Sequence, residues 1–172
     1  MLVNLSDVLT SQGKVIETTV PIELTSFQSR LGDFPVTDKT PVTFTFTNAG
    51  TDRAKVEGSA KITFDTLCDR CLTKVPVTLD LLFERIVTSP DVETEDEDSR
   101  DYMEGYQLDA EALLQNEIIV NWPVKILCKE DCKGVCPKCG QNRNTKDCGC
   151  DTFVPDPRMA VLKDIFNANK EV

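Results

Sequence analysis

Eight cysteines, gathered in two regions far apart along the chain, are the feature that most restricts how this sequence can fold. Cys68 and Cys71 stand in the phrase TLCDRCL. The other six fall within LCKEDCKGVCPKCGQNRNTKDCGC, which spans residues 127–150. Thiols in such a pattern form disulfides, act as a redox couple or bind a metal. Most conclusions about this chain depend on which of these uses applies.

The cellular compartment decides which use is open to the thiols. The opening residues, MLVNLSDVLTSQGKVIE, lack the basic start and apolar core of a secretory signal. No apolar run approaches the ~18 residues of a membrane span. We therefore expect a cytoplasmic protein without membrane contact, in which thiols are kept reduced. The cysteine content, 8 in 172 residues, is also below the ~8–10% of disulfide scaffolds, so a disulfide framework is disfavoured.

Three stretches in the first half of the chain alternate apolar and polar residues with the period of a half-buried β-strand. They cover residues 41–47, 55–67 and 75–84. Three apolar residues upstream indicate a further strand: Val20, Ile22 and Leu24. After it we expect a loop that contains Gly32 and Pro35, and before it a short helix near Leu5–Ser11.

Helix signals follow in the second half. Asp109 is a natural N-cap, and Leu108 and Leu113 occupy the positions of a hydrophobic staple. We expect this helix to cover residues 109–121 and to end before Pro123. The segment PDPR predicts a last helix, with Asp156 as its N-cap.

The predicted fold class is α+β. It is an antiparallel β-sheet or partly open barrel with a few short helices and a C-terminal cysteine-rich zinc-knuckle segment. Residues 1–124 form the expected β-rich core, which includes the helix and an acidic loop at 90–104. Residues 125–172 form the zinc-binding segment and a C-terminal helix packed on the core, so that the chain is a single structural unit.

Charge is unevenly distributed within the net −10 of the chain. The loop at 90–104 holds eight acids against Arg100 alone. Dense like charge resists packing and predicts a solvated connector. The alternative is that the loop binds a basic partner, such as a ribosomal protein. The cysteine-rich region carries the opposite sign, in six cations: Lys125, Lys129, Lys133, Lys138, Arg143 and Lys146.

Cys68 and Cys71 lie between two predicted strands, at the tip of a hairpin. A C-x-x-C in a tight turn presents two sulfurs together, as in a zinc knuckle. A thioredoxin-type C-x-x-C instead opens a helix, whose amides lower the thiol pKa. The strand that follows here favours the metal-binding interpretation.

The remaining cysteines divide by spacing. Cys136 and Cys139, with Pro137 and Gly140 shaping the turn, form a second knuckle, and Cys148 and Cys150 follow closely enough to complete a local Cys₄ site. Two cysteines are left without local partners: Cys128 and Cys132. Their pairing with the distant C-x-x-C gives a second Cys₄ site, which would fasten the end of the helix to the hairpin tip.

Zinc suits closed all-thiolate sites of this kind, and such sites are structural rather than catalytic. Two filled sites would take the net charge to about −14, because each leaves about −2. The cations of residues 125–146 then offset thiolate charge, or contact RNA phosphates. Iron–sulfur ligation is the competing metal chemistry. The chain has no histidine, which removes the commonest general base.

These motifs resemble those of the YceD-like proteins, a family linked to accumulation of large-subunit ribosomal RNA. The resemblance lies in CDRC at 68–71, EIIVNWPV at 117–124, LCKEDCKGVCPKCG at 127–140, CGCD at 148–151 and DPRMAVLKDI at 156–165. It implies a bacterial or organellar factor of ribosome biogenesis with no settled catalytic activity. Its partner would be ribosomal RNA or a ribosome-assembly protein, and no small-molecule substrate is implied.

Two functions from different classes are compatible with the sequence. The first is a non-enzymatic accessory factor that supports synthesis, processing or accumulation of large-subunit ribosomal RNA, with about two Zn²⁺ ions per chain. The second is a cytosolic thiol-disulfide oxidoreductase that uses Cys68 and Cys71. The sequence does not assign nucleic-acid-binding residues.

Overall fold

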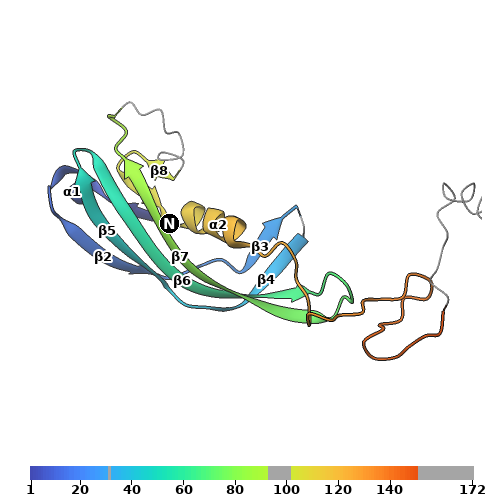
Figure 1. Cartoon of the computed structure of the whole chain (residues 1–172). Coiled ribbons are helices and arrows are strands. Elements are labelled where there is room, and N and C mark those ends of the chain that lie inside the picture. Colours follow the sequence, from blue (N-terminus) through green and yellow to red (C-terminus); the bar gives the residue numbers. More distant parts are fainter. Residues whose placement is uncertain (31, 93–101, 151–172) are drawn as a thin grey trace, which may run out of the picture.

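The computed structural model of the chain describes residues 1–30, 32–92 and 102–150. Figure 1 shows one curved antiparallel sheet with helix α2 (Ala110–Asn121) lying over its concave face. The cysteine-rich residues continue beyond the end of the sheet. No helix in these ranges is long and apolar enough to cross a membrane.

The main sheet has six strands, in the order β2-β5-β6-β4-β3 with β7 also paired to β6. Their bounds are β2 (Val15–Val20), β3 (Ser26–Ser29), β4 (Gly32–Lys39), β5 (Val42–Gly50), β6 (Arg53–Leu67) and β7 (Lys74–Thr88). β7 pairs with β6 along the whole of both strands. On the other edge of β6, β5 pairs with its first half and β4 with its second half. β6 is therefore the strand that holds the sheet together.

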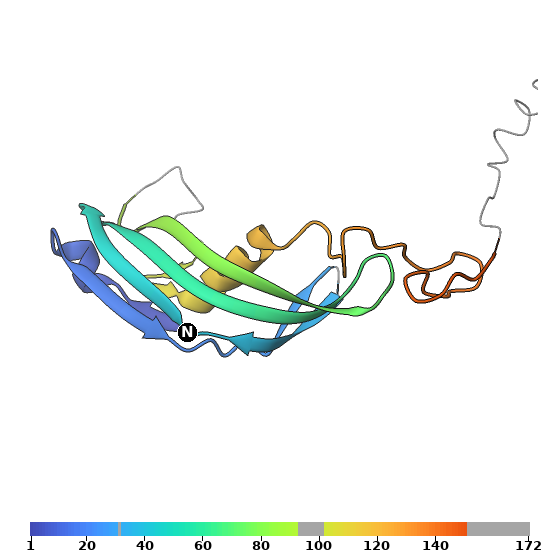
Figure 2. The same ribbon diagram turned by 60° about the horizontal axis from the view of Figure 1, so that its bottom comes forward.

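A smaller sheet lies beside the first turn of α2. It contains β1 (Leu2–Asn4), β8 (Met103–Glu104) and β9 (Gln107–Asp109), in the order β1-β9-β8. Helix α1 (Ser6–Thr10) follows β1 and contacts β5 and β6. These elements close the end of the core that lies away from the cysteines (Figure 2).

The core forms where the apolar face of the sheet meets α2. Alternate residues of β5 and β6 are fully buried, among them Phe44, Phe46 and Ile62, as their period-2 pattern predicts. From α2, Leu113 and Ile118 enter the same cluster. The apolar face of the sheet and the buried face of α2 thus pack against each other, and the side chains on the other face of the sheet remain in water.

An aromatic cluster fixes the point where the chain leaves α2. The Trp122 ring centroid lies 4.7 Å from that of Phe34, 5.3 Å from that of Phe27 and 5.2 Å from that of Phe64. These three rings belong to β4, β3 and β6. The cluster therefore anchors the end of α2 to the sheet close to the β6–β7 turn.

The start of α2 is capped as the sequence predicts. Asp109 Oδ1 accepts hydrogen bonds from the backbone N–H groups of Glu111, at 3.0 Å, and Ala112, at 3.2 Å. These bonds and those to the N-terminal amine outweigh burial and lower the pKa of Asp109. The staple residues Leu108 and Leu113 are both fully buried. The expected helix at 109–121 is confirmed.

Several further predictions can be compared with the structure. The antiparallel sheet is confirmed, but the described strands do not close into a barrel, because β2 and β7 remain separate edges. The expected loop with Gly32 and Pro35 is wrong, since these residues belong to β4, which forms a hairpin with β3. Ile22 and Leu24 lie after β2, outside any strand. Pro35 is tolerated because β4 pairs with β6 only from Val36 onward.

Two other predictions concern residues that the structure does not describe. Residues 93–101 of the acidic loop and residues 151–172, with the helix expected after Asp156, lie outside the described ranges. The last part of that loop, Met103–Glu104, forms strand β8. The division of the chain at residue 124 stays a prediction.

Close packing between β6 and β7 yields a stability test. Gly58 lies directly opposite Phe83, and a Cβ at position 58 would be 2.2 Å from Phe83 Cζ. We expect Gly58→Ala to lower the free energy of unfolding by about 1–3 kcal/mol, because the buried ring must move. Denaturant unfolding of the variant measures this effect. Ser59→Ala, on the exposed face of the same strand, is the control, and equal midpoints for the two variants would contradict the prediction.

Candidate metal centres

The first candidate centre begins at the turn between β6 and β7. The Cys68 N–H donates to Thr73 O at 2.8 Å, and the Leu72 N–H donates to Cys68 O at 2.9 Å. Leu72 takes a φ of 58°, which lets the turn close. Cys68 is 0% exposed and Cys71 is 5% exposed. The turn therefore directs both sulfurs inward, away from solvent.

Asp69 brings the segment after α2 to this turn. Its backbone N–H donates to Ile126 O at 2.9 Å, and its carboxylate Oδ2 accepts from the Ile126 N–H at 2.6 Å. This two-point contact places the residues that follow Ile126 beside the hairpin tip. Sequence reasoning did not assign Asp69 this role, although its position inside the C-x-x-C places it at the turn.

The four sulfurs of the first centre converge. Cys68 Sγ lies 3.8 Å from Cys132 Sγ, and Cys71 Sγ lies 3.5 Å from Cys128 Sγ. All four lie within 4.8 Å of one another. Four thiolates at ~2.3 Å from a central ion would be about 3.8 Å apart, whereas bonded sulfurs are ~2.05 Å apart. The spacing fits a metal-ligand tetrad, and all eight cysteines are free.

The second candidate centre is built from two glycine-containing turns. The Cys136 N–H donates to Gln141 O and the Gly140 N–H donates to Cys136 O, both at 2.8 Å. Gly140 has a φ of 70° and Gly149 a φ of 63°, conformations that suit glycine. The Sγ atoms of four cysteines meet here within 4.8 Å of one another: Cys136, Cys139, Cys148 and Cys150. Both groups of four predicted from spacing are thus brought together.

Backbone amides favour ionisation of Cys68 in the first tetrad and of Cys136 in the second. Burial opposes ionisation of Cys68, but the backbone N–H groups of Arg70, Cys128 and Cys71 outweigh it and lower its pKa to about 6. The N–H groups of Cys139 and Lys138 lower the pKa of Cys136 to about 6. Amides directed at sulfur stabilise a thiolate, which is the form that binds metal.

Crowding of the sulfur atoms raises the pKa of other thiols in each tetrad. The neighbouring Cys71 sulfur, with burial, raises the pKa of Cys128 to about 12. Cys148 and Cys139 raise that of Cys150 to about 12. Four thiolates at this spacing repel one another unless a cation lies between them. Each tetrad could therefore hold a metal ion, which would supply the missing positive charge.

The two centres are joined by Asn144, whose importance the sequence did not signal. Its side chain Nδ2 donates to Cys132 Sγ at 3.3 Å, and its Oδ1 accepts from the Lys133 N–H at 2.9 Å. Asn144 lies in the loop between the two cysteine pairs of the second centre, yet it contacts a ligand of the first. The second centre is therefore less independent of the first than its spacing indicated.

Two further contacts strengthen this joint. The Val135 N–H donates to Arg70 O at 3.0 Å, and Asn142 Nδ2 donates to Thr73 Oγ1 at 3.2 Å. Gly134 lies so close to the hairpin that a Cβ there would be 3.0 Å from Arg70 O. The β6–β7 turn thus contacts the loop of the second centre as well as the residues of the first.

The comparison with known families supports the resemblance stated above. A family sequence model described as "Large ribosomal RNA subunit accumulation protein YceD" matches residues 56–166. The match begins inside β6 and includes all eight cysteines. No curated protein and no solved structure matches the chain.

The Asn144 joint can be tested without knowledge of the metal. Replacement by alanine removes the acceptor of the Lys133 N–H and the donor to Cys132 Sγ, so we expect Asn144→Ala to cost about 1 kcal/mol. Amide hydrogen exchange should become faster around residues 132–146 while β5 and β6 remain protected. The exposed Gln141, changed to alanine, is the control. Unchanged protection at Lys133 would show that Asn144 does not hold the joint.

Proposed function

The chain belongs to the YceD family, and we propose that it is a non-enzymatic accessory factor of ribosome biogenesis with two structural zinc sites. In this role it supports synthesis, processing or accumulation of large-subunit ribosomal RNA in the cytoplasm. The family match carries the ribosomal role, and the two cysteine tetrads carry the metal sites, since they gather every thiol of the chain into two compact groups. The partner is ribosomal RNA or a ribosome-assembly protein.

Zinc is favoured over other metals by the character of the ligands. Both sets consist of four cysteine sulfurs, and zinc accepts tetrahedral all-thiolate ligation in structural sites. A site with four protein ligands leaves no open position for water or substrate, so it stabilises the fold and does not catalyse. The turns with amides directed at sulfur also suit this role.

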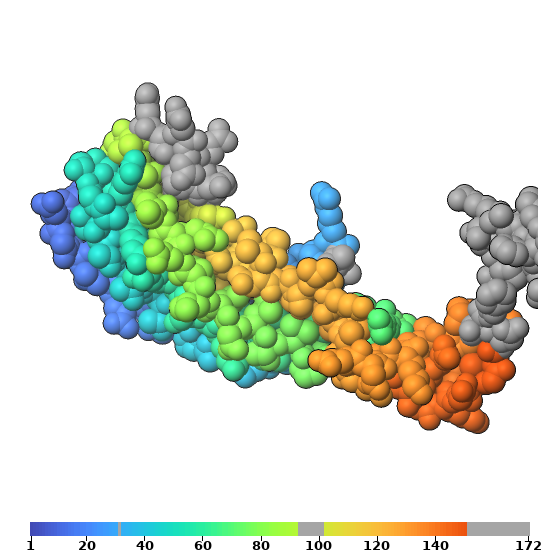
Figure 3. Space-filling model, in the orientation of Figure 1, coloured from blue at the N-terminus to red at the C-terminus, as the bar shows by residue number. Residues whose placement is uncertain are grey.

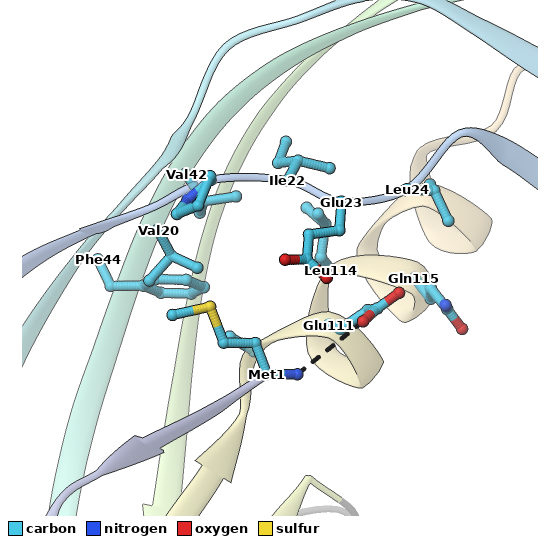
Figure 4. A pocket seen from close by; sticks show the side chains of 12 residues that line it. Met1, Val20, Ile22, Glu23, Leu24, Val42, Phe44, Glu111, Leu114 and Gln115 are labelled. Atoms are coloured by element: carbon cyan, nitrogen blue, oxygen red, sulfur yellow. Dashed lines mark ion pairs between the residues drawn. The ribbon is translucent and has the colours of Figure 1, made fainter.

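The pocket around Met1 is too small to be a small-molecule site. Figure 4 shows the Met1 side chain lying toward Val20 and Phe44, beside Leu114 of α2. The cavity that remains has a volume of ≈ 20 Å³, room for about one water molecule. The Met1 amine lies 3.9 Å from Glu111 Oε2 at its edge. This pocket is too small to hold a metabolite.

The alternative function, thiol-disulfide oxidoreductase, has one observation in its favour. The pKa of Cys68 is lowered to about 6, as in many reactive thiols. However, Cys68 is 0% exposed, and a strand rather than a helix follows the C-x-x-C. A redox thiol must be reached by its substrate, so burial among three other sulfurs favours the metal site.

Metal content tests the assignment of the ligands. Protein purified without chelator should contain about two zinc ions per chain. Cys71→Ser and Cys139→Ser should each reduce this to about one. We expect Cys71→Ser to lower the main unfolding transition more, because its site joins the sheet to a segment over fifty residues away in sequence, whereas Cys139 belongs to a local loop.

Each outcome of the metal analysis has a clear meaning. Iron with visible absorption would contradict the zinc assignment. One zinc ion in the wild-type protein would mean that one tetrad is free. Rapid labelling of Cys68 by a thiol reagent without chelator, together with insulin reduction, would support the oxidoreductase. Labelling that becomes fast only after chelation is the result expected for a metal site.

The proposed role in ribosome biogenesis is tested in cells. Deletion of the gene from its own organism should lower the amount of large-subunit ribosomal RNA relative to small-subunit ribosomal RNA. The wild-type gene should restore the ratio, and the Cys71→Ser gene should restore it poorly. Expression at equal protein level, checked by immunoblot, is the control. An unchanged ratio in the deletion strain would contradict the proposed function.

A further inference from the structure

A recess lies beside the joint between the two candidate centres. Six residues line it: Lys133, Arg143, Asn144, Thr145, Lys146 and Asp147. Its volume is ≈ 490 Å³, far larger than the pocket at Met1. Three of its six lining residues are cations, whereas the chain as a whole has a net charge of −10.

The walls of the recess are fixed by hydrogen bonds. Asn144 Oδ1 accepts from the Lys133 N–H at 2.9 Å, and the Arg143 N–H donates to Gly134 O at 2.9 Å. On the far wall, the N–H groups of Thr145 and Lys146 donate to Asn142 O at 3.2 and 3.3 Å. Lys133 comes from one segment of the chain, and Arg143 and Lys146 come from one turn of another. All three line the same recess.

These cations are not neutralised by neighbouring carboxylates. Within the described ranges, no ion pair involves Lys133, Arg143 or Lys146. Asp147, the one acid of the recess, uses Oδ1 to accept from the Gly149 N–H at 3.2 Å. By contrast, three lysines of the main sheet each lie within 3.3 Å of a carboxylate oxygen: Lys55, Lys61 and Lys74. The positive charge of the recess is therefore available to a bound anion.

Its position suits contact with a large anion. Figures 2 and 3 show the cysteine-rich residues at one extreme end of an elongated molecule, beyond the β6–β7 turn. Residues 125–150 have six bases and three acids, while the rest of the chain has a large excess of acids. Two zinc-filled tetrads would bring this segment close to neutrality, at about −1. The main sheet, residues 15–88, has ten acids and eight bases, so the two regions differ little in net charge, and the recess is distinguished by its three cations without ion-pair partners among the described residues.

We propose that this recess binds phosphate groups of a ribosomal RNA backbone, in an extension of the function proposed above. Lysine and arginine supply the positive charge and the N–H donors that phosphate oxygens accept from. The six lining residues include no aromatic side chain on which a base could stack. Recognition here is therefore of the backbone, and it does not depend on base sequence.

The salt dependence of RNA binding tests this site. The zinc-loaded full chain is titrated with a short, fluorescein-labelled, single-stranded RNA of mixed sequence. Three phosphate contacts predict a slope of about −2 in log K against log salt, which is a loss of roughly twentyfold in affinity between about 50 and 200 mM salt. The triple variant Lys133→Gln, Arg143→Gln, Lys146→Gln should lose this dependence and bind at least about tenfold more weakly at the lower salt.

A matched variant separates the site from net charge. Lys55→Gln, Lys61→Gln, Lys74→Gln removes the same charge from the main sheet, and it should bind RNA as the wild type does. Equal weakening by both triple variants would overturn the proposal. So would tighter binding of poly-glutamate than of RNA, since the recess would then fit an acidic protein segment. Measurements of zinc content and of the unfolding midpoint check that both variants are folded. Lys133→Gln alone is a milder variant, and it should lose about one-third of the slope of log K against log salt.

The same variants in cells keep this inference distinct from the proposed function. If the wild-type gene restores the ribosomal RNA ratio and the recess triple variant does not, both are supported. If the recess variant restores it fully, the recess proposal is wrong and the proposed function stands. If deletion of the gene leaves the ratio unchanged, the proposed function fails, whatever RNA binding is measured in solution.

Discussion

The continuous pairing of β6 with β7 is the constraint on which the rest of the structure depends. It runs from Arg53 opposite Thr88 to Leu67 opposite Lys74 without a shift of register. Because strand side chains alternate, one fixed register places most apolar residues of both strands on the face that α2 covers. Leu67, Leu82 and Ile86 are exposed exceptions. The same pairing carries the β6–β7 turn well beyond the core. The turn then presents Cys68 and Cys71 where the segment after α2 can reach them.

That segment has little means of folding by burial alone. Apart from its cysteines, residues 125–150 contain three aliphatic side chains: Ile126, Leu127 and Val135. A region so poor in apolar residues does not offset its own conformational entropy. Hydrogen bonds of Asp69 and Asn144 therefore contribute strongly to ordering this segment, since they hold it against the β6–β7 hairpin. Metal ions bound in the two tetrads would supply the folding free energy that apolar packing does not provide in this segment.

The sequence predicted those parts of the structure that repeat a period or satisfy a spacing rule. The long strands follow from alternation, α2 follows from its cap and staple, and the two groups of four cysteines follow from spacing and from the tip of one hairpin. The β3–β4 hairpin was missed because Gly32 and Pro35 are turn residues in most contexts. Here Pro35 lies just before the part of β4 that pairs with β6. Asn144 was missed because a single polar residue in a loop has no periodic signal.

Asn144 also links the proposed metal sites to the proposed RNA contact. The same side chain that donates to Cys132 Sγ accepts from the Lys133 N–H, so it orders a ligand of one centre and a wall of the recess together. The other wall belongs to the loop that the second tetrad closes. A recess built in this way keeps its shape only while both loops are held. In these two proposals, RNA contact depends on structural metal, because the metal sites would order the surface that contacts RNA.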